Sequence, residues 1–152
     1  MELKLKALYE PLTVQIGDAV VNTAIDVTAD NLVKISEVCT KAKKEMDGVS
    51  AMQRKAKENQ DHKLLQKMNN KAAEVMEPAI VAAIGQQGYD DIVKACGAGR
   101  EISKSSCNVV MMRVLFAIME TVAEQQQNVI NEKAAHYLAE ADDAQPIFNA
   151  AV

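Results

Sequence analysis

Aromatic residues are scarce in this chain, which holds no Trp, two Phe and three Tyr among 152 residues. Its three Cys residues, at positions 39, 96 and 107, form no CxxC pair, which disfavours a disulfide framework or a zinc knuckle. No uninterrupted run of about 18 apolar residues occurs, which disfavours a membrane span. The net charge of −4 disfavours a general nucleic-acid binder.

Ala and Met are abundant instead, with 23 and eight residues, and hydrophobic residues make up 49% of the chain. This composition excludes a chain that is disordered throughout. The length fits a single domain with its own core. The N-terminal stretch has no continuous apolar segment before Pro11, so it does not resemble a secretory signal. We therefore expect a small, mostly helical, soluble protein that stays in a reducing cytoplasm, with one domain over 1–141.

Residues 2–27 have the pattern of β-structure. Glu2, Lys4 and Lys6 alternate with Leu3, Leu5 and Ala7, and a second alternating run follows Pro11. Alternation with period two is typical of a strand with one buried face. Gly17-Asp18 is a turn signal. The sequence predicts two or three short antiparallel strands with a hairpin at 17–18, and this unit must pack on helices or pair with another chain.

From Thr28 onward the period becomes helical. Apolar residues recur every three or four positions over 29–46, and Asp47-Gly48 predicts the end of that helix. A second helix is predicted over 50–76, antiparallel to the first because the turn is short. Its middle, KENQDHK at 57–63, offers nothing to a core. The second helix therefore either projects into solvent there or is broken by a loop.

Pro78 suits the first turn of a new helix, so short helices are predicted over 78–84 and 89–95, each closed by glycines. A long helix is predicted over 104–141. Its segment 107–119 is apolar almost all round and should lie in the core or in a subunit interface. Residues 142–152 are predicted to form a flexible tail. The expected fold class is α+β and mostly α-helical: an N-terminal antiparallel hairpin or small sheet, then a helical bundle with a long C-terminal helix.

Charge is segregated along the chain. Residues 41–71 hold nine Lys/Arg and four Asp/Glu, whereas residues 77–152 hold five and ten. The basic stretch is either a solvated helix face or a docking surface for an acidic partner. The opposite charges of the two parts would favour head-to-tail association between copies, unless both parts satisfy each other within a monomer. Met residues on the helical stripes are either core filler or an adaptable binding surface. The candidate partner-binding residues are Met52, Lys55, Met68, Met76, Ile147 and Phe148.

No sequence motif for catalysis, cofactor binding or metal binding is found. The segment CGAGREISKSS at 96–106 lacks the phosphate-loop pattern, although its backbone N–H groups could hold an anion. His62 and His136 lie 74 residues apart without ligand-like neighbours. The Cys residues are read as small buried hydrophobes, with a reactive thiol as the alternative. We expect no enzymatic activity, no cofactor and no bound metal.

Residues 1–46 resemble the start of the tail assembly chaperones of long-tailed bacteriophages and of related small phage tail proteins (MELKLKALYEPLTVQIGDAVVNTAIDVTADNLVKISEVCTKAKKEM). A short β-segment leads there into helices rich in Ala, Lys and Val. The resemblance implies a non-enzymatic protein that coats the tape-measure protein and recruits tail-tube subunits, without fixed functional residues. It also implies protein partners, a homo-oligomer, neither nucleic acid nor membrane as partner, and a place in the bacterial host cytoplasm.

This resemblance suggests a mechanism in which helical apolar stripes shield a helical client and the hairpin edge pairs with a neighbouring copy or with tube protein. The alternatives are a structural phage protein, such as a head–tail joining or minor virion component, a cellular helical adaptor for an acidic partner, and an enzyme.

Overall fold

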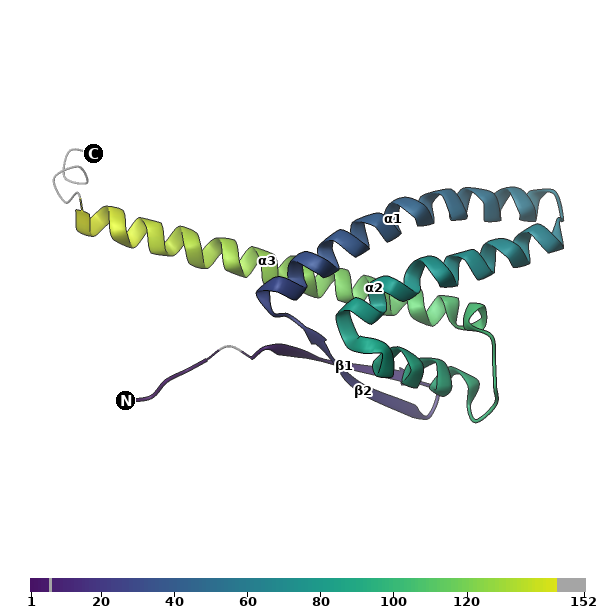
Figure 1. The fold of residues 1–152 in the computed structure, drawn as a ribbon, viewed down its shortest axis with the longest axis horizontal. Helices are drawn as coiled ribbons and strands as arrows, with labels where there is room; N and C mark the ends of the chain where they lie inside the picture. Colours follow the sequence, from purple (N-terminus) through teal and green to yellow (C-terminus); the bar gives the residue numbers. More distant parts are fainter. Residues whose placement is uncertain (6, 145–152) are drawn as a thin grey trace.

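A two-stranded antiparallel sheet leads the fold (Figure 1). The computed structural model describes residues 1–5 and 7–144, with side chains up to Leu138. Strands β1 (Tyr9–Ile16) and β2 (Ala19–Asp26) pair in the register Ile16↔Ala19 to Tyr9↔Asp26. The two-residue loop Gly17-Asp18 sets this register. The predicted hairpin is therefore confirmed, and the sheet has two strands.

The predicted strand at residues 2–8 is wrong. Residues 1–5 are extended and belong to no strand, and β1 begins only at Tyr9. Leu3 and Leu5 are 75% and 81% exposed. The alternation is present, but a strand also needs a neighbour for its backbone groups, and nothing in the described part of this chain supplies one. The segment runs away from the sheet (Figure 1).

Helices α1 (Ala29–Glu58) and α2 (His62–Gly97) form an antiparallel pair (Figure 1). The predicted stop at Asp47-Gly48 is wrong, since α1 continues through it. Val49 and Ala56 are 6% and 1% exposed, so continuing the helix carries its apolar stripe further along α2, which outweighs the low helix propensity of Gly. The chain turns instead at 59–61, within the polar stretch, and the Asp61 side chain accepts a hydrogen bond from Leu64 N (3.0 Å) as an N-cap. Of the two possibilities for that stretch, the loop is correct.

From His62 onward, α2 joins the predicted helices at 50–76 and 78–84, whereas the predicted break between 78–84 and 89–95 is confirmed at Gly85, whose φ of 82° and ψ of 166° are not helical. Pro78 does not begin a new helix but lies inside α2. Buried residues on both sides of it, such as Met76 and Ile80, hold the helix in the core and offset the cost of an interior Pro. The chain does bend at Gly85, whose φ of 82° suits a residue without Cβ. Asn31 Nδ2 donates to the carbonyl oxygen of Ala82 (3.0 Å), just before this bend.

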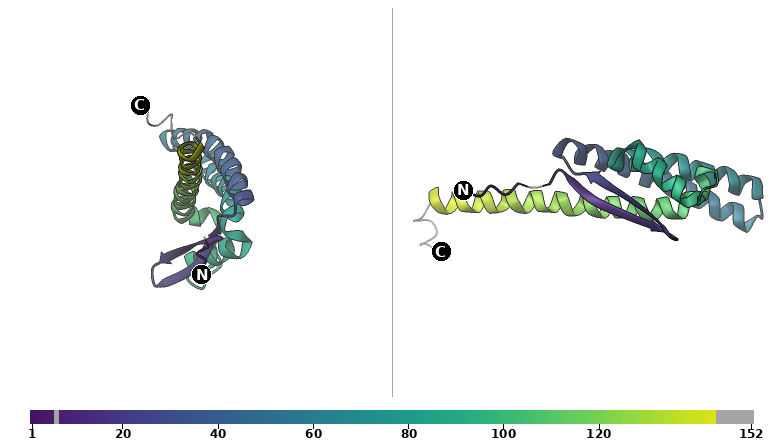
Figure 2. Two further views of the ribbon diagram at one scale, coloured as in Figure 1. Left: turned by 90° about the vertical axis from the view of Figure 1, so that its left-hand side faces the viewer. Right: turned by 90° about the horizontal axis from the view of Figure 1, so that it is seen from below.

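A 3₁₀ turn, η1 (Lys104–Cys107), leads into α3 (Asn108–Ala144). This start agrees with the predicted helix at 104–141. Residues 142–144 are helical rather than part of the predicted tail, because α3 continues through Asp142 and Asp143 without a stop signal. Residues 145–152 lie outside the described part. The first part of α3 packs on α2 and α1, and the second part projects well beyond them (Figures 1 and 2).

The core lies where both helices of the α1–α2 pair, the inner face of β2 and the first part of α3 meet. Its most buried side chains include Ile35, Ile80, Ile92 and Ile118, each 0% exposed. The segment 107–119, predicted to lie in the core or in an interface, contributes Cys107, Met111, Val114, Leu115 and Ile118 to this core. Val109 and Phe116 of the same segment stay 74% and 59% exposed. One face of this segment is therefore buried and one is open.

We expect Gly88→Ala and Gly48→Ala to change stability in opposite directions. A Cβ at Gly88 would lie 2.8 Å from Thr23 Oγ1 and 3.2 Å from Ile84, where β2 rests on α2, whereas a Cβ at Gly48 meets nothing within 4 Å. Thr23 is β-branched and moves poorly. Gly88→Ala should lower the free energy of unfolding by about 1 to 2 kcal/mol, and Gly48→Ala should raise it by about 0.5 to 1 kcal/mol. Urea denaturation of both variants checks this, and two shifts of equal sign would contradict it.

Candidate partner-binding surfaces

An apolar stripe runs along the outer side of α3. Val109, Phe116, Ala123, Ile130 and Tyr137 follow one another every seven residues, and we call these five residues the α3 stripe. Four of them are 58% to 74% exposed, and Ala123 is also exposed. Residues seven apart lie near one another on one side of a helix, so these five residues form a single exposed strip. Sequence reasoning missed this stripe, although the spacing that defines it was visible in the sequence.

The two halves of the α3 stripe have different surroundings. Val109 and Phe116 border a shallow hollow of about 330 Å³, together with Met112. Ala123 borders another of about 350 Å³ between α1 and α3, together with Met119. The half-buried Met112 and Met119 are flexible side chains that can adapt to a partner.

Beyond Gln126, α3 leaves the body of the protein. Gln126 Nε2 donates to Ser36 Oγ (2.9 Å), and every side chain from 127 to 138 is exposed. Ile130, Tyr137 and Leu138 are 58% to 68% exposed there. A helix with an unburied apolar face gains little from its own chain. This half of α3 therefore presents apolar surface that no other described part of the chain covers.

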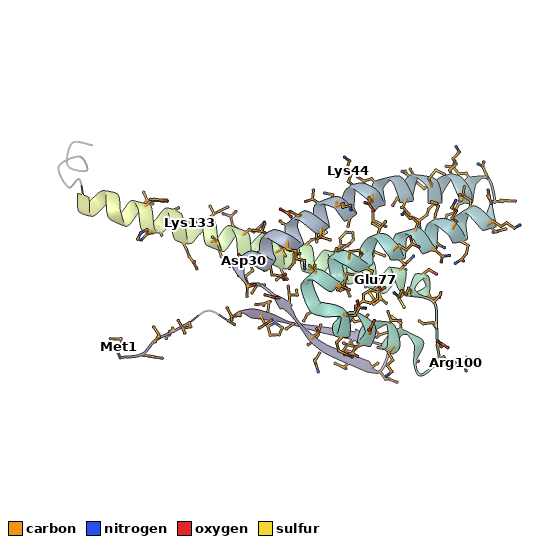
Figure 3. The ribbon with its side chains drawn as sticks, in the orientation of Figure 1. Met1, Asp30, Lys44, Glu77, Arg100 and Lys133 are labelled. Carbon is orange, nitrogen blue, oxygen red and sulfur yellow. The ribbon has the colours of Figure 1, made fainter. Side chains whose placement is uncertain are left out.

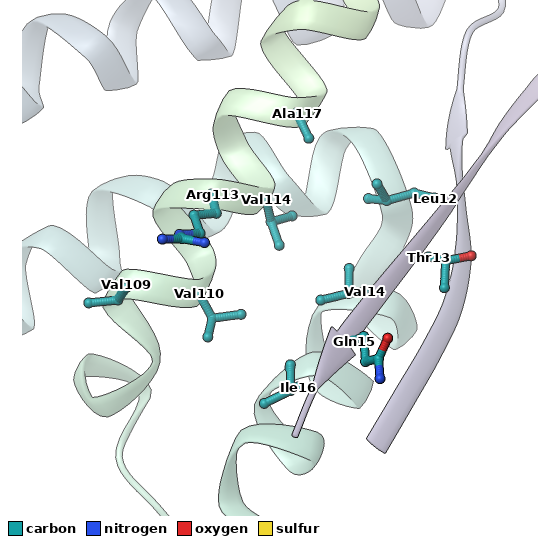
Figure 4. A pocket seen from close by; sticks show the side chains of 10 residues that line it. All are labelled: Leu12, Thr13, Val14, Gln15, Ile16, Val109, Val110, Arg113, Val114 and Ala117. Atoms are coloured by element: carbon teal, nitrogen blue, oxygen red, sulfur yellow. The ribbon is translucent and has the colours of Figure 1, made fainter. Parts of the chain in front are cut away.

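A second apolar surface lies between β1 and α3. It is a groove of about 410 Å³ lined by residues 12–16 of β1 and by five residues of α3. Leu12, Val14 and Ile16 point from the strand towards α3, whose Val110 and Val114 point back (Figure 4). Thr13 and Gln15 lie on the other face of the strand (Figure 4). The inner face of β2 packs on α2, but that of β1 leaves this gap open.

A polar cleft of about 580 Å³ borders the segment that joins α2 to η1. It contains acidic Asp90 and Asp91 and basic Lys94, Arg100 and Lys104. Lys104 Nζ lies 2.6 Å from Glu77 Oε1 and 5.6 Å from the centre of the Tyr89 ring, and its hydrogen bond with Glu77 raises the pKa of Lys104. These contacts fasten η1 onto α2. The anion site predicted at 96–106 belongs to the rim of this cleft and stays a prediction.

Burial makes two of the three thiols less acidic. Burial raises the pKa of Cys39, and burial, together with the neighbouring Cys96 thiol, raises the pKa of Cys107 to about 12. Cys39 and Cys107 are 6% and 1% exposed. A neutral, covered thiol is a weak nucleophile, so both side chains behave as core residues. Cys96 is half-buried.

We expect stability to fall in alkali partly through Tyr89. This side chain is 1% exposed, and burial, with the nearby Glu77, Cys107 and Asp90, raises its pKa from 10.0 to about 12. Below pH 10 the phenol is neutral in both states, so stability is unaffected. Between pH 10 and about 12 the unfolded chain loses this proton first, which lowers the free energy of unfolding by about 1 kcal/mol near pH 11. Urea titrations at pH 8 and pH 11 should show a smaller loss for Tyr89→Phe than for the wild type, and an equal loss would contradict this.

Of the four predicted partner-binding residues with described side chains, Met76 is buried and the other three are at least partly exposed. Met52 is 38% exposed and Lys55 is exposed on α1, and Met68 is half-buried on α2. Met76 is 1% exposed and is a core residue rather than a binding one, because its helical stripe faces the other elements. Ile147 and Phe148 lie outside the described residues.

The basic stretch of residues 41–71 forms the half of the α1–α2 pair that contains the turn between the two helices. All nine of its Lys and Arg side chains are exposed, and Lys44 lies on the side of α1 turned away from α2 (Figure 3). Within the part of the chain with described side chains, Lys71–Glu74 (3.9 Å) is the single ion pair made by this stretch. Most of this positive charge is therefore open to solvent.

Among the residues with described placement, no three His, Cys, Asp or Glu side chains gather as a metal site. The stretch Lys104–Leu138 is long and apolar enough to cross a membrane, and 33% of its most apolar window is buried inside the protein. A core helix of a soluble protein has the same length and composition. Comparison of this chain with protein-family models, curated proteins and solved structures finds no match.

Proposed function

We propose that this protein is a non-enzymatic assembly chaperone that binds a helical client along α3. The α3 stripe carries this proposal, because an exposed apolar strip along a helix is a surface on which the apolar face of a client helix can lie. The resemblance to tail assembly chaperones of long-tailed bacteriophages supplies the client class, the tape-measure protein, and a second partner, the tail-tube subunits. No ligand chemistry is needed for this role.

The physical basis is coverage of apolar surface. A client helix lying along α3 would remove Phe116, Ile130 and Tyr137 from water, at about 25 cal/mol for each Å² of apolar surface buried. Met112 and Met119 would adjust to different client side chains. The resemblance implies a long helical client, and a helix of this kind is bound by laying its apolar face on an apolar surface.

Co-expression with a helical fragment of the tape-measure protein from the same genome tests the proposal. The wild type should copurify with the fragment, and Phe116→Glu with Ile130→Glu should lose it. Asn128→Glu is the matched control, because Asn128 lies on the opposite side of α3 from Ile130. Failure of the wild type to bind, or equal binding by the stripe variant, would refute the proposal. Mass spectrometry of purified particles separates a chaperone, which is absent from them, from a structural virion protein, which is present.

The exposed charge of residues 41–71 favours one second candidate, an adaptor for an acidic partner. Lys55 and Lys63 lie on either side of the turn between α1 and α2, where both are exposed. Binding through them would weaken steeply as salt concentration rises, whereas binding through the α3 stripe would not. Salt titration of any complex, with Lys55→Glu plus Lys63→Glu as the variant, distinguishes the two.

A further inference from the structure

The groove between β1 and α3 lies beside an unpaired strand edge. Val27 N donates to Leu8 O (3.0 Å), which continues the hairpin ladder by one pair. In an antiparallel pair, alternate residues direct both backbone groups towards the partner strand. Leu8, Leu12 and Val14 therefore direct theirs towards β2. The N–H groups of Thr13 and Gln15 point towards the free edge of β1. The carbonyl groups of Pro11, Thr13 and Gln15 point the same way.

Pro11 occupies a position that agrees with this assignment. It pairs across from Ala24, yet its nitrogen carries no hydrogen and falls on the free side of β1. Pro is tolerated in a strand where its nitrogen faces away from the ladder. The open edge available to another strand is consequently the part from 12 to 16, which is also the part of β1 that lines the groove.

Residues 1–5 have the alternating pattern of a strand that could pair with this edge. They are extended, they alternate, and they expose Leu3 and Leu5 on one side. Glu2 and Lys4 fall on the other side. The β1 edge at 12–16 can pair with an extended segment of this kind. A strand placed there would direct Leu3 and Leu5 at Val110 and Val114 across the groove and leave Glu2 and Lys4 in solvent, beside Thr13 and Gln15.

Residues 1–5 cannot pair with the β1 edge of their own chain. Residues 1–5 lead directly into β1, and folding back would need a tight reverse turn near residues 6–11. Residues 9–11 of that stretch already pair with β2 as the first part of β1, so such a turn cannot form while the hairpin is intact. In the fold the segment runs away from the sheet, in the general direction of the projecting part of α3 (Figures 1 and 2).

We propose that residues 1–5 of one copy add as a third strand to the free β1 edge, residues 12–16, of a second copy. Leu3 and Leu5 fill the groove under α3, and the backbone groups of Thr13 and Gln15 gain partners. Each copy then offers a strand and accepts one, so the contact joins unlike surfaces and builds a ring, an exchanged dimer or an open chain. The groove shares Val109 with the α3 stripe, but the other four stripe residues take no part in this interaction, and it does not rest on the client proposal.

Sedimentation of the full chain over a wide concentration range tests the inference. The wild type should rise above the monomer mass as concentration increases. Leu3→Asp with Leu5→Asp should remain at the monomer mass, and Lys4→Gln, on the opposite side of the segment, should behave as the wild type. These substitutions lie in an exposed segment outside the core, so folding is retained. A wild type that stays monomeric at its highest soluble concentration overturns the inference.

A labelled peptide, MELKLKAL, checks the acceptor side. It should bind the full-length Leu3→Asp, Leu5→Asp variant, and Thr13→Pro added to that protein should weaken binding at least about tenfold, because it removes an edge N–H. Thermal melting of the Thr13→Pro protein shows whether the hairpin is intact. If association survives Leu3→Asp with Leu5→Asp but disappears in Ile130→Glu, the α3 stripe makes the contact between copies and the strand inference is wrong. Binding of tail-tube protein, but not of the peptide, to the same edge would also overturn it.

Discussion

A chain that ends after Gln127 is expected to keep its stability and to lose its helical client. Every side chain from 127 to 138 is exposed, and Gln126, just before this stretch, donates a hydrogen bond to Ser36 of α1. Removing exposed residues away from a core changes the free energy of unfolding by less than about 1 kcal/mol. The same deletion removes Ile130 and Tyr137, which are two of the five positions of the α3 stripe. We expect client affinity to fall by at least about tenfold.

Urea denaturation and client pull-down on the same preparations measure both effects. A chain that ends after Ala144 is the matched control, because it keeps the α3 stripe and removes Ile147 and Phe148. If this longer chain also loses the client, the contact lies at residues 145–152, as the sequence predicted for Ile147 and Phe148. A large loss of stability in the shorter chain would mean that the projecting half of α3 supports the fold, contrary to its exposure.

Ile80→Ala is expected to have the largest effect on stability. Ile80 is 0% exposed and lies in the straight part of α2 before the bend at Gly85. Ile80 belongs to the core cluster that residues of β2, α1, α2 and α3 form together, so the structure cannot collapse easily into the space left by the lost atoms. Truncation of a fully buried Ile costs about 2 to 5 kcal/mol, which is a large fraction of the stability of a domain of this size.

Val33→Ala in α1 is the matched control for this variant. Val33 is 58% exposed, so its truncation removes little buried surface, and Ala has the higher helix propensity. We expect a change within about 0.5 kcal/mol. Equal losses for Ile80→Ala and Val33→Ala in chemical denaturation would show that the core is not centred where the fold places it.

Helix α3 shows how much of a candidate site can be predicted from the sequence. The apolar residues of 107–119 predicted a helix that is either buried or in an interface, and both descriptions hold for different faces. Met111, Val114 and Ile118 face the core, while Val109 and Phe116 are left open. The seven-residue spacing that continues to Tyr137 could have been read from the sequence, but its exposure depends on which side α1 and α2 cover.

The Met residues show the limit of the same reasoning. Met52, Met68 and Met76 share one residue type and similar helical spacing, so sequence alone grouped them as partner contacts. Their exposures differ, from 38% for Met52 to 1% for Met76, because each position meets a different part of the fold. An apolar helical stripe predicts that its residues are covered by other apolar groups. Only the packing shows whether those groups belong to the core or to a partner.

By itself, the sequence determined the local elements: the hairpin at Gly17-Asp18, the change to helical period at Thr28, and the start of the long helix near Lys104. These depend on turn chemistry and on periodicity, which act over a few residues. Tertiary structure decided where the helices end. It carried α1 through Gly48 and α2 through Pro78, because burying Val49, Ala56 and Ile80 outweighs local helix preference. It also decided that Leu3 and Leu5, with a correct strand pattern, have no strand beside them, since pairing requires a neighbour that no local pattern can provide.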